Sequence, residues 1–146
     1  MEPMSRRNGR EEMEMELPDV VPATDGQLTV GLYSSARVVG DLIFVAGHTA
    51  LAPDGSVAHP GDPEAQMRYT LDAINVTLSQ YGATVNDLVQ IRLYLTDVRS
   101  REALLSIRRE YFTAPYPAST LLGVTALALE GLTVEIDGVA VVPRRG

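Results

Sequence analysis

Glu135 and His48 are the side chains of this sequence best suited to move a proton. Glu135 lies in the otherwise apolar segment 133–142, where burial would raise its pKa toward the range of a general acid or base. The alternative interpretation is that Glu135 faces solvent, with Asp137 beside it on the same face of the strand. His48 follows Gly47 at the end of a predicted strand, where an imidazole can shuttle protons near neutral pH. Its alternative role is a hydrogen bond that steadies the next loop.

The composition excludes several classes of chemistry. The chain has no Cys, which excludes disulfides, thiolate nucleophiles and cysteine-ligated metal centres. All 12 basic residues are Arg, so no lysine Schiff base can form. His59 is the only other histidine and lies in a predicted surface loop, so a histidine-rich metal centre is not expected. The composition therefore opposes metal centres built on Cys or several His and cofactor chemistry that depends on Lys.

Charge and hydropathy indicate the kind of partner. The net charge of −7 opposes binding to nucleic acid, which needs a basic face, and equally opposes a polybasic membrane anchor. No stretch approaches the ~20 apolar residues of a membrane span, and the first 19 residues contain no apolar signal segment. We therefore expect a cytoplasmic, soluble protein that acts on a small molecule.

The length of 146 residues suits a single domain. Residues 1–19 hold six acidic residues and three arginines with almost no aliphatic side chains, which is typical of a solvated tail. The sequence therefore predicts an acidic N-terminal tail over 1–19 and one domain over 20–146.

Two helices are predicted. The first begins with Asp62 as its cap and Pro63 at the first helical position, and it ends at Gly82. Its apolar residues recur at steps of three and four: Met67, Leu71, Ile74, Leu78 and Tyr81. The second begins with Ser100 as its cap and runs through Phe112.

Six strands are predicted around these helices. Residues 89–96 alternate at period two, and Gly40 begins a two-residue turn between two strands. The expected strands are 28–33, 37–39, 42–46, 89–96, 120–124 and 133–142. The resulting order β-β-β-α-β-α-β-β predicts an α+β fold in which two helices pack on one mixed sheet.

Several segments together resemble the RidA/YjgF family of enamine/imine deaminases, over about residues 28–142. They are 42–48, Gln66 near the start of the first helix, 89–97, 111–112, the pair 117–118, and 134–141. The resemblance implies a chorismate-mutase-like fold and a homotrimer with three clefts between subunits. It also implies hydrolysis of 2-imino or 2-enamino acids to 2-keto acids and ammonia, without metal or cofactor.

The resemblance assigns roles to individual residues. Glu135 matches the acid that orients the hydrolytic water. Tyr33 matches a tyrosine that walls the cleft, with simple packing on the sheet as its alternative. Tyr116, between two prolines, would line the same mouth or occupy a surface turn. Ala46, Gly47 and Leu105 on the second helix would also line the cleft. Ala46 and Leu105 stand where the deaminases carry polar residues, which makes this cleft more apolar.

The strand after the Pro-Ala pair departs from the family pattern. Deaminating members carry there an Arg that binds the substrate carboxylate, whereas this chain has Ser119, followed by Thr120. A hydroxyl donates one neutral hydrogen bond and supplies no charge, so the typical 2-imino acid would lose its main anchor. Arg92, or an arginine of the second helix, would have to reach across a subunit boundary to replace it.

Three functions follow from these residues. The first is a cofactor-independent hydrolase or tautomerase acting on an imine or enamine, with Glu135 and His48 as catalytic residues. The second is a biosynthetic enzyme for cyclisation or dehydration on the same scaffold. The third is a ligand-binding trimer without catalysis, favoured by the missing Arg. Ribonuclease activity is disfavoured by the acidic charge.

Overall fold

The computed structural model describes residues 19–22 and 31–144. Within these ranges the chain forms a six-stranded sheet, two α-helices and two short 3₁₀ helices. The strands are β1 (Val20–Pro22), β2 (Ser34–Val39), β3 (Leu42–His48), β4 (Leu88–Leu95), β5 (Ala118–Gly123) and β6 (Val134–Val141). The helices are α1 (Pro63–Ser79), η1 (Val85–Asp87), η2 (Val98–Ser100) and α2 (Arg101–Tyr111).

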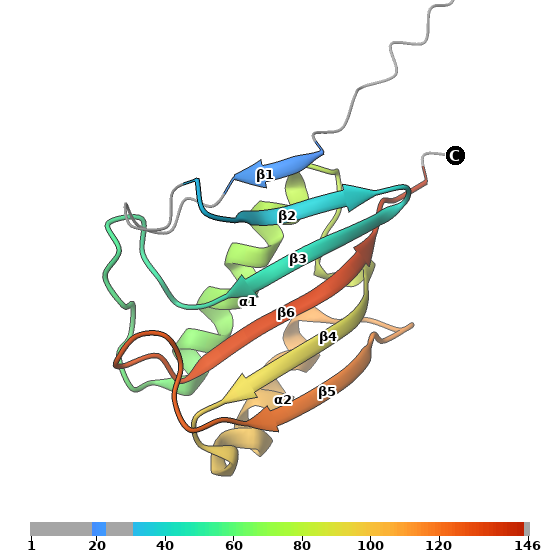
Figure 1. Cartoon of the computed structure of the whole chain (residues 1–146). Helices are drawn as coiled ribbons and strands as arrows, with labels where there is room; N and C mark the ends of the chain where they lie inside the picture. Colours follow the sequence, from blue (N-terminus) through green and yellow to red (C-terminus); the bar gives the residue numbers. More distant parts are fainter. Residues whose placement is uncertain (1–18, 23–30, 145–146) are drawn as a thin grey trace, which may run out of the picture.

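The sheet has the strand order β1-β2-β3-β6-β4-β5, and both α-helices lie on one of its faces (Figure 1). β4 and β5 are parallel, and every other neighbouring pair is antiparallel. The predicted α+β fold with a mixed six-stranded sheet and two helices is therefore confirmed. Insertion of β6 between β3 and β4 brings the C-terminal strand, which carries Glu135, to the middle of the sheet.

The first strand is not where the sequence predicts it. Of the predicted strand 28–33, residues 28–30 lie outside the described part of the chain, and 31–33 form a turn with a positive φ of 82° at Gly31. The strand that pairs with β2 is instead β1, through Val20–Pro22. A three-residue strand is too short to show a period-two pattern, so its position depends on the partner strand.

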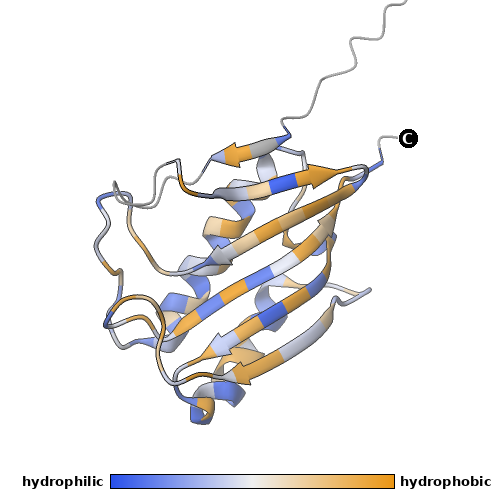
Figure 2. Ribbon diagram, viewed as in Figure 1, coloured by the Kyte–Doolittle hydropathy of each residue, from blue (hydrophilic) through white to orange (hydrophobic). Residues whose placement is uncertain are grey.

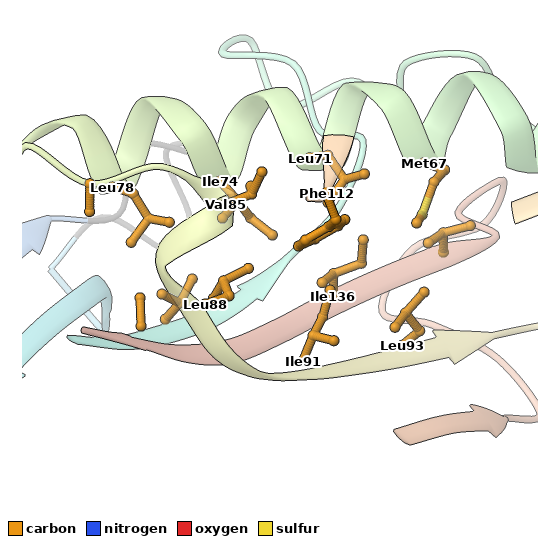
Figure 3. Close-up of a cluster of buried hydrophobic side chains, with 14 of the residues drawn as sticks. Met67, Leu71, Ile74, Leu78, Val85, Leu88, Ile91, Leu93, Phe112 and Ile136 are labelled. Atoms are coloured by element: carbon orange, nitrogen blue, oxygen red, sulfur yellow. The ribbon is translucent and has the colours of Figure 1, made fainter. Parts of the chain in front are cut away.

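Helix α1 begins as the sequence predicts. The Asp62 side chain accepts a hydrogen bond from the Ala65 amide at 3.1 Å, and Pro63 occupies the first turn. The apolar stripe is buried against the sheet (Figure 3). Its members Met67, Leu71, Ile74 and Leu78 pack with Leu88, Ile91, Leu93 and Ile136 from the central strands and with Phe112.

The start of α2 differs from the prediction. Ser100 stands at the N-cap position, but its side chain makes no cap hydrogen bond and donates instead to the Asp97 carbonyl at 2.6 Å. Asp97 is the capping side chain, because it accepts from the Arg99 amide at 2.9 Å and begins η2. The helix ends at Tyr111 rather than Phe112.

Gln66 joins the first turn of α1 to the loop before β6. Its side chain is fully buried, and its Nε2 donates to three carbonyls, those of Ala58, His59 and Gly131. Its Oε1 accepts from both the amide and the hydroxyl of Thr133. These five bonds fix the chain immediately before β6 and so fix where Glu135 enters the sheet.

The two faces of the sheet differ. On β6, buried residues face the helices and alternate with partly exposed ones on the other face, and the hydropathy colours alternate accordingly (Figure 2). Large apolar side chains also lie on the face away from the helices, including Leu42 at 41 % and Phe44 at 47 % exposure. No helix within the described ranges is long and apolar enough to cross a membrane.

Candidate functional site

The end of β3 is irregular and opens one side of the site. The register between β3 and β6 shifts between Val45 and His48, so Ala46 and Gly47 leave the regular ladder. This irregularity turns the His48 side chain toward α1. It also leaves Gly47 next to the Glu135 side chain near the start of β6.

His48 bridges β3 and α1. Its Nδ1 lies 2.7 Å from the Ala46 carbonyl, and its Nε2 lies 2.9 Å from the Thr77 hydroxyl. A carbonyl only accepts, so Nδ1 carries a proton and donates to Ala46. These two hydrogen bonds agree with the structural role that the sequence offers as an alternative for His48. They also hold the imidazole ring at the wall of a pocket.

Glu135 packs against Gly47. A Cβ built on Gly47 would lie 2.9 Å from the Glu135 Oε1 and 3.0 Å from its Cδ, so glycine allows the carboxylate its present position and a larger residue would displace it. Burial raises the pKa of Glu135, and the nearby Asp137 raises it further. Glu135 forms no ion pair within the described ranges, so no cation there compensates its negative charge.

Asp137, the neighbour of Glu135 on the same face, is fully engaged. Arg92 donates to it through Nε at 2.7 Å and Nη2 at 3.1 Å, and the Tyr94 hydroxyl donates at 3.0 Å. Burial, followed by the hydrogen bond to Asp137, raises the pKa of Tyr94. Arg92 is therefore committed to Asp137 within its own chain, whereas Glu135 forms no ion pair with the described residues.

A pocket of about 440 Å³ opens between the end of β3, the start of β2 and α1. That volume suits a small molecule. Its lining includes three predicted site residues, Tyr33, Gly47 and His48, and Gly47 also packs against Glu135. The remaining lining residues are Ser35, Thr49, Leu51, Pro53, Tyr69, Asp72, Ala73, Val76 and Thr77.

The other predicted residues lie elsewhere in the chain. Ser119 is paired with Ile91 on β4, three residues along the strand from Tyr94, the partner of Glu135. Its side chain faces the helices, because its Oγ accepts a hydrogen bond from Arg108 of α2 at 2.8 Å. Glu135 faces the opposite side, so one chain does not bring Ser119 and Glu135 together.

Three further candidates are spread around this second region. Thr120 is exposed and pairs with Arg92 on the sheet face away from the helices. Leu105 is half-buried on α2. Tyr116 is 71 % exposed and borders a separate shallow pocket rather than the one that holds Tyr33. Within a single chain the predicted site is thus divided into two groups.

Sequence reasoning missed two residues. Thr77 is almost completely buried, and its position three residues after Ile74 and next to Leu78 of the apolar stripe was the available signal. The second residue is Arg108, which is half-buried and whose guanidinium carbon lies 5.7 Å from the centroid of the Phe112 ring. Its spacing of three from Leu105 and four from Phe112 placed it on a partly apolar helix face.

Among residues 19–22 and 31–144, no group of three or more His, Asp or Glu side chains is arranged to hold a metal ion. The candidate site consists of a half-buried carboxyl group, a histidine held between β3 and α1 and an adjoining small pocket.

Comparison with known proteins identifies the family. The model of the family described as Endoribonuclease L-PSP matches residues 25–142. The RutC family protein YjgH of Escherichia coli is 36 % identical over 115 residues, covering 77 % of this chain and 85 % of that protein. The chain belongs to this family, which is the RidA/YjgF family.

Two further proteins agree with this assignment: one relative whose name states an activity, and one whose crystal structure is known. A 2-iminobutanoate/2-iminopropanoate deaminase of Dermatophagoides farinae is 26 % identical over 115 residues, covering 77 % of this chain and 88 % of that protein. The crystal structure of a YjgF/YER057c/UK114 family member from Mycobacterium tuberculosis superposes with a TM-score of 0.72 at 32 % identity. It covers 84 % of this chain and 98 % of that one.

Proposed function

We propose that this protein is a cofactor-independent enzyme that hydrolyses a small imine or enamine, with Glu135 as its acid–base residue. The observation that carries the proposal is the half-buried Glu135 carboxyl group of raised pKa, packed on Gly47 beside the 440 Å³ pocket. Family relatives named as 2-iminobutanoate/2-iminopropanoate deaminases support the substrate class.

The proposed reaction needs one group that first takes and then returns a proton. The substrate enters as the protonated imine. Ionised Glu135 accepts a proton from water as the water oxygen adds to the iminium carbon, which gives a neutral tetrahedral adduct with a hydroxyl and an amino group. Protonated Glu135 then donates to the amino group, the C–N bond breaks as ammonia leaves, and the hydroxyl proton passes to solvent water as the carbonyl forms. A raised pKa suits both steps, because it narrows the difference between the pKa of Glu135 and the working pH.

We further propose that the active assembly is a homotrimer with its clefts between subunits. The sheet face away from the helices is uncovered in one chain and carries exposed Leu42 and Phe44, which a second copy would bury. The division of the predicted residues into two groups favours the same assembly, because a neighbouring chain could bring its Ser119 region to Glu135.

Small imines fit this chain better than RNA does. The family model is described as an endoribonuclease, but the net charge of −7 would repel a polyanion. The pocket beside Gly47 has the size of a metabolite.

The test is ammonia and keto-acid release from freshly generated 2-iminobutanoate and bulkier imino acids. Glu135→Gln should lower kcat about 10²- to 10⁴-fold, the usual contribution of a general acid–base group, while the oligomer stays folded. Glu130→Gln is the matched control, since Glu130 is exposed and the charge change is identical. Turnover retained in Glu135→Gln, or no turnover in the wild type, would overturn the proposal.

A further inference from the structure

Arg108 occupies an unusual position for a guanidinium group. Its side chain extends from α2, and its Cζ lies 5.7 Å from the centroid of the Phe112 ring. Its Nη1 donates a hydrogen bond to the Ser119 hydroxyl at 2.8 Å. The side chain is thus held by two different elements, the end of α2 and the start of β5. This fixed geometry is what a binding residue needs and what a surface arginine normally lacks.

The charge of Arg108 is not compensated within the described ranges. Each of three other arginines lies within 4 Å of a carboxylate: Arg68 with Glu110, Arg92 with Asp137, and Arg99 with Asp97. Arg37, Arg101, Arg109 and Arg144 form no such pair there either, but they are exposed to water.

Arg108 alone among these eight is half-buried without an acidic partner. Burial lowers the pKa of its guanidinium, and no neighbouring charge offsets that effect. A partly desolvated charge without a counter-ion is costly.

The hydrogen-bonding capacity of Arg108 is also largely unused. A guanidinium has five N–H donors in a planar fork, and its one bond within the described residues goes to a neutral hydroxyl. The fork geometry matches a carboxylate, which accepts two parallel bonds. Leu105 and Phe112, three residues before and four after, lie on the same helix face and supply apolar surface beside the charge.

We propose that Arg108, positioned by Ser119 and Phe112, is the residue that binds the carboxylate of the substrate. Ser119 is then a positioning residue rather than a ligand of the substrate. The charge comes from α2 of the same chain as Ser119, and no arginine needs to cross a subunit boundary to reach this point. The substrate class is a small acid that combines a carboxylate with an apolar group. This inference rests on the proposed function only in taking the reacting group of the substrate to be an imine or enamine.

The test is calorimetric titration with 2-oxobutanoate, the keto acid that 2-iminobutanoate hydrolysis releases, and with its neutral amide. The wild type should bind the acid at least about 10-fold more tightly than the amide. Arg108→Gln should weaken acid binding about 10- to 100-fold, the range for hydrogen bonds to a charged group, and leave amide binding unchanged. Arg109→Gln, the exposed neighbour with the same charge change, should stay within about 2-fold of the wild type.

Substitutions at Ser119 separate positioning from direct binding. Ser119→Thr keeps the hydroxyl and should retain acid binding, whereas Ser119→Ala frees the guanidinium and should weaken it about 3- to 10-fold, the loss of one ordinary hydrogen bond. Should Arg108→Gln not fold, Arg108→Lys retains the charge without the fork and should give an intermediate affinity.

The outcomes distinguish this inference from the proposed function. Equal binding of acid and amide by the wild type, or equal acid binding by wild type and folded Arg108→Gln, would overturn the inference. An unchanged KM for imine hydrolysis in Arg108→Gln would overturn it too, while leaving the proposed function standing. Arg108-dependent binding without any turnover would support the inference and overturn the proposed function.

Discussion

The contact between Gly47 and Glu135 gives the sharpest prediction about catalysis. In Gly47→Ala the new methyl carbon would lie 2.9 Å from the Glu135 Oε1 and 3.0 Å from its Cδ. Ordinary van der Waals contact begins near 3.4 Å, so the carboxyl group must move by roughly half an ångström. The contacting atoms are the far end of a flexible side chain, and that end will move rather than the backbone.

The two consequences of this shift differ in size. The fold should lose less than about 1 kcal/mol, because the φ of Gly47 lies outside the region that demands glycine, and alanine there restricts the unfolded chain. Catalysis should suffer more. A misplacement of about 1 Å costs on the order of 10²-fold, so half an ångström should lower kcat about 10-fold.

The assay is imine hydrolysis by wild type, Gly47→Ala, Glu135→Gln and the double variant, with thermal melts of each. If Gly47→Ala acts through the carboxyl group, it should lower the activity of the wild type but not the residual activity of Glu135→Gln. An equal loss in both backgrounds, or full activity in Gly47→Ala, would refute the placement of Glu135 at the reacting centre.

Two further predictions concern stability. Gln66→Met keeps the volume but removes five hydrogen bonds at a buried site, which should cost about 3–5 kcal/mol and lower the Tm by about 10 °C. Gln80→Met, at an exposed position, is its control. If Gln66→Met lowers the Tm by less than about 3 °C, the role assigned to Gln66 is contradicted. The second prediction uses the raised pKa of Glu135, caused first by burial. The folded state binds this proton more tightly than the unfolded state, so wild-type stability falls as pH rises through the folded pKa. Glu135→Gln should thus match the wild-type Tm near pH 4 and exceed it near pH 7, and a constant difference would exclude a raised pKa.

The sequence predicted the elements whose signals are local. The stripe from Met67 to Leu78 repeats within one helix, and Asp62 caps the turn beside it, so neighbouring residues alone determine α1. Alternation likewise predicts the buried face of β4, where Ile91, Leu93 and Leu95 are fully buried. These patterns were confirmed because backbone geometry fixes their period.

Elements defined by a partner were less predictable. The edge strand β1 has only three residues, so pairing with β2 rather than its own pattern determines where it lies. At the start of α2, both Asp97 and Ser100 are capping residue types, and only the geometry of η2 shows that Asp97 makes the bond.

The sequence by itself determined which chemistry is possible. A chain without Cys or Lys and with two His must use carboxyl, imidazole, hydroxyl or guanidinium groups, and an acid in an apolar strand is a natural proton carrier. Tertiary structure alone decided which of these groups meet. Gly47 and Glu135 are distant in the chain yet in contact. Arg108 donates a hydrogen bond to Ser119 and is half-buried. The physical reason is that periodicity reports the environment of one element, whereas contacts between elements depend on how the whole sheet assembles.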